Sequence, residues 1–295
     1  ALFFLPSISG YPDRVSLLKE VSTGLDSLAL LVGQKDADVD TAGYDRFSVV
    51  DARFRRGWLP WNMWRASRLA EEMVRQAGVD VVHDTFGALL PLFWRKRRYP
   101  SVRFVTSLYI LKSWRRRHVW GHLGALRILS SRHTALFFLT LWMERRICAA
   151  ADYVVLQAHG LTDHLLEDGR VPSSKVRILT NSVDTGFWSP GNGRPPPNGH
   201  QRECRLLFVG GIDVSKGMVA MIETLHLLKE WGHPARLTIV GKWGHAAKSA
   251  AFRLLDRYGV GNKIDLLPRT SREELRQVYR DADLFVYQTI NDGSP

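Results

Sequence analysis

Short apolar runs alternate with amphipathic segments along this chain, and the alternation stops once and then restarts. In the first part, apolar and β-branched runs predict six strands, at residues 2–5, 27–32, 46–50, 79–83, 102–106 and 153–156. Helices are predicted between them, over residues 14–23, 62–76 and 136–150.

After the interruption, four more strands are predicted, at residues 206–209, 236–240, 263–267 and 284–287. They alternate with predicted helices over residues 217–231, 246–258 and 271–280, the last with a capping box of Ser271 and Glu274. This pattern favours parallel sheets covered by helices, an α/β fold with two Rossmann-like doubly wound domains.

The interruption is the stretch SPGNGRPPPNGHQR at residues 189–202, which holds four prolines and three glycines and predicts an exposed linker. We therefore expect an N-terminal domain at residues 1–188 and a C-terminal domain at residues 203–295. Ligands of doubly wound sheets bind beyond the carboxyl ends of the strands, so a ligand cleft is expected between the domains. Because the chain ends in NDGSP just after its last predicted strand, the second domain is expected to be incomplete.

The net charge of +12 is concentrated in one block. Residues 91–150 hold 13 Lys and Arg against one acid, whereas the rest of the chain holds 28 basic and 28 acidic residues. Within this block, WRKRR and WRRRHVWGH mix arginine with tryptophan over residues 94–122. That composition suits an anionic membrane surface. Nucleic acid would attract the same charge, and a solvated face with extended Arg side chains is the simplest alternative.

Other features of the sequence exclude some classes of protein. No run approaches 18 apolar residues, so no transmembrane helix is expected. The opening ALFFLPSISG has no basic leader and turns early, which favours a first strand over a signal peptide. Cys148 and Cys204 fall in different predicted domains, as expected in a reducing compartment. We therefore expect a cytoplasmic protein, peripheral on the inner membrane face.

The stretch RLLFVGGIDVSKG at residues 205–217 predicts a phosphate site. A strand breaks at Gly210 and Gly211, and Lys216 precedes a predicted helix whose apolar face ends before Gly232. Backbone N–H groups and the positive helix end would then lie beside an ammonium group. The motif is not a P-loop, because Gly217 follows the lysine, and an ordinary strand-to-helix turn with a solvated lysine is the alternative.

Four stretches in order resemble the retaining GT-B glycosyltransferases of group 1, or family 4. They are ADYVVLQAHGLTDHLLEDGRVPSSKVRILTNSVDTGFWSPG at residues 151–191, VGGIDVSKG, LTIVGKW at residues 237–243, and SREELRQVYRDADLFVYQTINDGSP at residues 271–295. The resemblance implies transfer of a sugar, with retention of configuration, from a UDP-, GDP- or similar nucleotide-sugar donor to a glycan or lipid-linked acceptor. It implies no metal and no other cofactor, because basic groups take the diphosphate charge.

The resemblance also implies roles for individual residues. Lys216 matches the lysine that stabilises the leaving diphosphate, and Asp292 matches the first acid of the acid-x7-Glu motif near the donor sugar. The second acid would fall beyond Pro295, and Gly211 stands where the family has an arginine. The residues implied for donor binding are Gly10, Gly210, Gly211, Lys216, Gly241, Asp292, Gly293 and Ser294.

Histidine positions depart from the family. The family often has a histidine after the fifth strand, and residues 106–109 (TSLY) hold none. His83 and Asp84 close the fourth predicted strand, where a structural role for His83 is favoured over an acceptor-site role. His118 lies among arginines and is expected on the surface.

The resemblance thus implies a hexosyltransferase, and two other classes of protein are the alternatives. A non-catalytic sugar-nucleotide-binding or scaffold protein would be consistent with Gly211 in place of arginine. A nucleic-acid-binding protein is not expected, because RRM, KH and zinc-finger motifs are missing.

Overall fold

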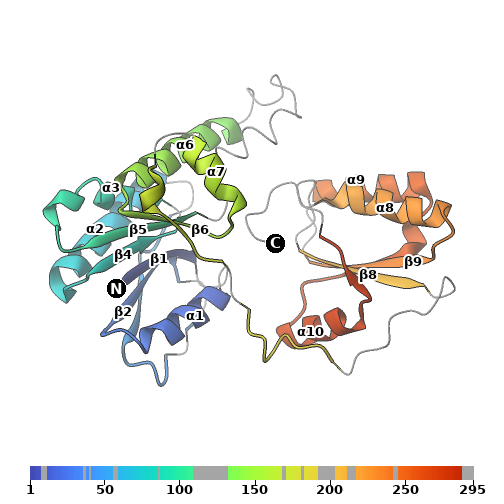
Figure 1. Cartoon of the computed structure of the whole chain (residues 1–295), viewed down its shortest axis with the longest axis horizontal. Helices are drawn as coiled ribbons and strands as arrows, with labels where there is room; N and C mark the ends of the chain where they lie inside the picture. Colours follow the sequence, from blue (N-terminus) through green and yellow to red (C-terminus); the bar gives the residue numbers. More distant parts are fainter. Residues whose placement is uncertain are drawn as a thin grey trace. The chain divides into compact units, whose positions relative to one another are not determined.

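A computed structural model of the chain describes residues 1–7, 12–35, 38–39, 41–55, 59–85, 87–108, 132–167, 171–180, 183–191, 203–210, 217–241 and 245–287. Its contacts divide the chain into two compact units, Ala1–Asn181 and Ser182–Gly293. Each unit is built on a parallel sheet, which confirms the predicted α/β fold (Figure 1). The division falls ahead of the proline-rich stretch, because residues 183–191 pack on the second unit.

The first unit contains a seven-stranded parallel sheet in the order β3-β2-β1-β4-β5-β6-β7. Its strands are β1 Leu2–Ser7, β2 Leu28–Gln34, β3 Phe47–Asp51, β4 Val81–Asp84, β5 Arg103–Leu108, β6 Tyr153–Leu156 and β7 Val176–Ile178. The first six match the six predicted strands. The seventh, VRI, is a three-residue edge strand, too short to produce a periodic signal in the sequence.

Helices cover both faces of this sheet. They are α1 Pro12–Ser22, α2 Leu59–Ala77, α3 Leu90–Phe93, α6 Arg132–Ala150 and α7 Gly160–Glu167, with short 3-10 turns η1 Lys96–Arg98 and η2 Ser173–Lys175. One core cluster joins α2, α3, α6 and α7 to one face, and a second joins α1 to the other (Figure 1). Strand order reverses between β1 and β4, so the carboxyl ends of these two strands form the switch point at which doubly wound sheets bind ligands.

The second unit contains a four-stranded parallel sheet in the order β10-β9-β8-β11. Its strands are β8 Cys204–Val209, β9 Ala235–Val240, β10 Ile264–Leu267 and β11 Leu284–Phe285, which match the four predicted ones. Its helices are α8 Met218–Glu230, α9 His245–Tyr258 and α10 Arg272–Asp281, with η4 Gly261–Lys263. The predicted capping box at the start of α10 is present, with Glu274 N–H bonded to Ser271 Oγ at 3.2 Å.

Residues 183–191 form a strap on α10. Asp184 Oδ1 accepts hydrogen bonds from the N–H groups of Gly186 and Phe187, which fixes a tight turn at the start of the strap. The ring of Trp188 then packs edge-on against Tyr279 of α10, at 5.6 Å between ring centroids. The strap therefore belongs structurally to the second unit.

Candidate functional site

Two glycines end neighbouring strands at the carboxyl edge of the second sheet. Gly210 follows β8 with φ 154° and Gly241 follows β9 with φ 155°, a region that favours glycine. Gly210 N–H bonds to Val240 O at 2.9 Å, which places the two glycines side by side. A Cβ at Gly210 would also come 3.2 Å from the ring of Phe208. Backbone can therefore approach a ligand closely at this edge, where the sequence predicted glycine turns.

The start of α8 lies after the same strand end. Gly217 is its N-cap in the left-handed conformation, φ 79°, and makes no side-chain cap, while the first turn holds no acidic residue. The N–H groups of Met218, Val219 and Ala220 have no intrahelical acceptor by helix geometry. This end of α8 therefore presents backbone donors and the positive end of the helix dipole, which suits an anion.

Packing holds that helix start in place. Met218, Met221, Ile222 and Leu225 are buried against the sheet, on the face that the sequence spacing predicted. At the other end, Gly232 has φ 73° and His233 N–H bonds to Leu228 O at 2.8 Å, a glycine C-cap as predicted.

Several predicted site residues lie outside the described part of the chain. They are Gly10, Gly211, Lys216, Asp292, Gly293 and Ser294, together with His118. Lys216 immediately precedes the Gly217 N-cap in sequence. Their assigned roles remain predictions.

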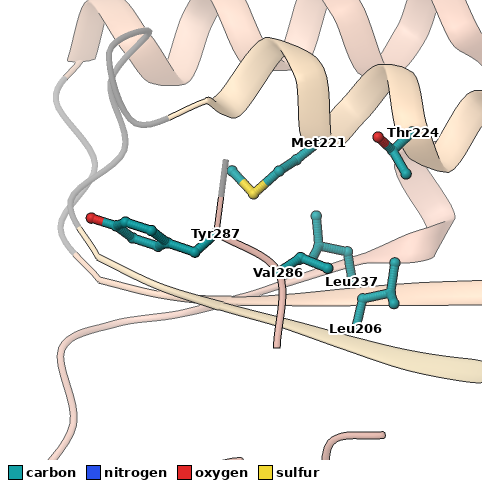
Figure 2. A pocket seen from close by; sticks show the side chains of 6 residues that line it. All are labelled: Leu206, Met221, Thr224, Leu237, Val286 and Tyr287. Atoms are coloured by element: carbon teal, nitrogen blue, oxygen red, sulfur yellow. The ribbon is translucent and has the colours of Figure 1, made fainter. Parts of the chain in front are cut away.

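A pocket of about 260 Å³ lies beneath α8, next to β11 (Figure 2). It is lined by Leu206, Met221, Thr224, Leu237, Val286 and Tyr287. Among the described residues that line it, two bear a hydroxyl group and none is cationic, and one of the two, Thr224, already donates to Ala220 O within α8 at 2.8 Å. The described lining is mostly apolar, which differs from the backbone donors at the start of α8.

In the first unit, polar side chains at the end of β4 brace the switch point. Asp84 is fully buried, and its carboxylate accepts from Gly87 N–H at 3.1 Å and Leu89 N–H at 2.7 Å, just before α3. Thr85 Oγ1 donates to Phe4 O at 2.8 Å, which ties the end of β4 to β1. These bonds fix the loop after β4, and sequence reasoning gave Asp84 and Thr85 no such role.

His83 lies on the opposite face of β4 from Asp84. Its Nε2 is 2.6 Å from Ser107 Oγ on β5, and its ring packs on Phe3 at 4.2 Å between centroids. Burial lowers the pKa of His83 to about 4, so the ring is neutral at pH 7. These contacts support the structural interpretation of this histidine.

Among the described residues, no three His, Cys, Asp or Glu side chains gather as a metal site would need. Both cysteines are free thiols.

The fold and the glycine edge together define a class, the two-domain Rossmann-like proteins of the GT-B fold. Residues 22–182 match the glycosyl transferase 4-like domain, and residues 195–295 match the glycosyl transferases group 1 family. The chain belongs to the group 1 glycosyltransferases of the family 4 type.

Curated relatives agree with this assignment. D-inositol 3-phosphate glycosyltransferase of Mycobacterium sp. (strain KMS) is 26% identical over 156 residues, covering 51% of this chain and 35% of the relative. GDP-mannose:cellobiosyl-diphosphopolyprenol alpha-mannosyltransferase of Xanthomonas oryzae pv. oryzae (strain PXO99A) is 26% identical over 155 residues, covering 52% and 39%. The chain thus matches less than two fifths of the length of either relative.

Among solved structures, sucrose-phosphate synthase from Thermosynechococcus elongatus superposes with a TM-score of 0.71 at 13% identity, over 100% of this chain and 76% of that one. At this identity the likeness establishes the fold alone.

Proposed function

We propose that this protein is a hexosyltransferase that moves a sugar from a nucleoside diphosphate sugar to an acceptor, with retention of configuration and without a metal. The observation that carries the proposal is the start of α8, where helix geometry leaves the first N–H groups without an intrahelical acceptor and which follows the Gly210 edge in the sequence. Lys216 stands one residue before that helix cap, so an ammonium group and a helix dipole would act on the same diphosphate.

In the proposed reaction, an acceptor hydroxyl attacks the anomeric carbon from the face that the diphosphate leaves. The bond from the anomeric carbon to the phosphate oxygen breaks, a bond to the acceptor oxygen forms, and the hydroxyl proton passes to the departing phosphate. Lys216 and the α8 N–H groups stabilise the charge that develops on the diphosphate. Asp292 orients the donor sugar, and Gly293 and Ser294 supply N–H groups to it.

Glycines give the donor room in this scheme. A side chain at Gly210 or Gly241 would be strained at their φ values and would stand at the edge the donor approaches. Gly10, after β1, would serve the same purpose at the switch point of the first unit.

We further propose a lipid-linked or other cell-envelope acceptor, of the kind met in exopolysaccharide synthesis. Support comes from the name of the Xanthomonas relative, which specifies a cellobiosyl-diphosphopolyprenol acceptor, whereas the name of the Mycobacterium relative specifies an inositol phosphate. The second name also supports a GDP-sugar among candidate donors.

A non-catalytic sugar-nucleotide-binding protein is the second candidate. Gly211 favours it, because the family's arginine at that position would be half of the basic pair that stabilises the leaving group. Binding without transfer would identify this case.

The proposal is tested by thermal unfolding of the protein with UDP, GDP, ADP and their sugar conjugates, for the wild type and Lys216→Ala. A ligand at 100 times its Kd should stabilise the wild type by about 2.7 kcal/mol and should stabilise Lys216→Ala much less. Lys229→Ala is the matched control, because Lys229 lies in the last turn of α8 and donates to Gly259 O.

A shift that persists unchanged in Lys216→Ala would contradict the phosphate site. Where one nucleotide sugar binds, release of its nucleoside diphosphate in the presence of polyprenyl-phosphate glycans then distinguishes an enzyme from a binding protein.

A further inference from the structure

Helix α6 is apolar on its outward face as well as on its core face. Leu141, Met143, Ile147 and Cys148 are buried in the core of the first unit. On the other side, Phe138, Leu139 and Trp142 are 45%, 40% and 43% exposed. A surface helix of a globular protein normally carries polar residues on its outward face, so α6 departs from that pattern.

Trp94 joins this outward face from a distant part of the sequence. It follows α3 directly, is 54% exposed, and meets Trp142 edge-on at 5.9 Å between ring centroids. α3 and α6 contact each other on the same face of the sheet (Figure 1). We call Trp94, Phe138, Leu139 and Trp142 the α3–α6 patch. Contiguous exposed apolar side chains of this kind mark interaction surfaces.

The border of the patch is basic. The Arg146 guanidinium lies over the Trp142 ring at 5.6 Å, and the exposed Arg97 and Arg98 of η1 follow Trp94 closely in the sequence. Residues 91–150 contain one acid, Glu144, and its side chain is buried. The patch therefore carries cations at its edge without a competing exposed carboxylate from that block.

Two of the cations in the WRKRR motif form ion pairs within the fold and are not available to a partner. Arg95 bonds to Glu71, and Lys96 bonds to Asp152 at 2.8 Å. These two charges serve the fold, which leaves Arg97 and Arg98 from this motif. Residues 109–122 of the expected membrane segment lie outside the described part of the chain. The α3–α6 patch is therefore formed by α6 and by Trp94 from the start of that segment.

Helix α2 repeats the same chemistry. Trp61 and Trp64 are 39% and 44% exposed and stack at 5.1 Å, and the Arg68 guanidinium lies 5.4 Å from the Trp64 ring. α2 contacts α3, and both α2 and α6 present tryptophan with a neighbouring arginine outward.

We propose that the α3–α6 patch docks the first unit on the surface of an anionic lipid bilayer. Tryptophan settles at the level of the lipid headgroups, apolar side chains such as Leu139 enter the acyl boundary, and arginine binds lipid phosphate. Charge complementarity favours this occupant, because the rim is basic and a bilayer of acidic lipid is uniformly anionic. The helices lie along the surface, and no described helix is long and apolar enough to cross a membrane.

The test is co-flotation of the intact protein with vesicles of phosphatidylcholine alone or mixed with phosphatidylglycerol. We expect binding to the mixed vesicles only, and weaker binding as salt rises from about 0.1 to about 1 M, over which the screening length falls from about 10 to about 3 Å. Trp94→Ser with Trp142→Ser should weaken binding by about tenfold or more, and Arg146→Gln by about fivefold. Trp231→Ser is the control, because Trp231 is a 67% exposed tryptophan of the second unit.

Equal binding of the wild type and the Trp94 and Trp142 double variant would overturn the proposal, as would salt-independent binding to neutral vesicles or no binding at all. Far-UV circular dichroism of each variant shows that it is folded, and Arg146→Gln tests the same surface without removing apolar contacts. Because vesicle binding needs no nucleotide sugar, this inference stands or falls independently of the proposed sugar transfer. A patch that instead binds a protein would show no vesicle binding and thereby count against the lipid assignment.

Discussion

Buried polar side chains at the switch point of the first unit are each committed to a structural bond. Asp84 accepts hydrogen bonds from two backbone N–H groups, Thr85 donates one to Phe4 O, and His83 is hydrogen-bonded to Ser107. A histidine at the carboxyl end of a parallel strand would, from sequence alone, be a candidate base. Its ring is neutral and packed on Phe3, so its contribution is to stability.

This role predicts a pH dependence of stability. Burial lowers the pKa of His83 from 6.5 to about 4, so between these values the unfolded state binds the proton that the folded state excludes. The free energy of unfolding should therefore fall as pH drops from 6.5 toward 4, by about 1.4 kcal/mol for each unit of pKa difference at most. Urea unfolding at several pH values measures this loss, and His83→Gln should remove that part of it. A His83 ring that titrates near 6.5 by NMR would contradict the prediction.

The sequence predicted the elements that carry a clear local pattern and missed others that do not. The ten strands were predicted because each contains a short run of apolar residues, and α10 because Ser271 and Glu274 mark its start. The three-residue β7 and the one-turn α3 are too short to show periodicity. The sequence predicts residues 183–188 as the end of the first domain and residues 189–191 as the start of the linker, because the strap's contacts to α10 join residues that are distant in sequence.

Of the candidate site, the sequence predicted the strand, the glycine and the helix start, because each is local. The pocket lined by Leu206 and Tyr287 was not predicted, since its walls come from four separate segments. The Trp94 and Trp142 contact was missed for the same reason: composition identified the basic block without showing which of its side chains meet.

The strap should contribute to the stability of the second unit. Arg272 and Arg276 lie over the Phe187 ring at 4.3 and 4.6 Å, and Arg280 donates to Ser189 O at 3.2 Å. Because Trp188 is only partly buried, Trp188→Ala should cost less than a core aromatic, about 1–3 kcal/mol. Trp231→Ala, at a 67% exposed position, should change stability by less than about 0.5 kcal/mol. Urea unfolding followed by circular dichroism measures both, and equal effects of the two substitutions would show that the strap contacts add nothing.

Across the whole molecule, burial and charge are distributed unevenly between the units. Among the residues that the structure describes, the first unit has two core clusters on the two faces of its sheet and the second has one, with no residue in common. The basic block at residues 91–150 lies entirely within the first unit. The proposed membrane surface and the proposed diphosphate site therefore belong to different cores, so a change in one core need not disturb the other function.

Separate cores predict separate losses of stability, which a matched pair of substitutions can measure. Leu31 of β2 and Leu237 of β9 are 0% and 1% exposed, and each lies in the core cluster of its own unit. Leu→Ala at either site should cost about 2–5 kcal/mol, because it leaves a cavity in a close-packed interior. If the units unfold independently, amide hydrogen exchange should accelerate in β8 to β10 for Leu237→Ala and in β1 to β6 for Leu31→Ala, with little change in the other unit. Faster exchange in both units from either substitution would mean that they unfold as one cooperative body, and vesicle binding would then be expected to weaken in Leu237→Ala as well.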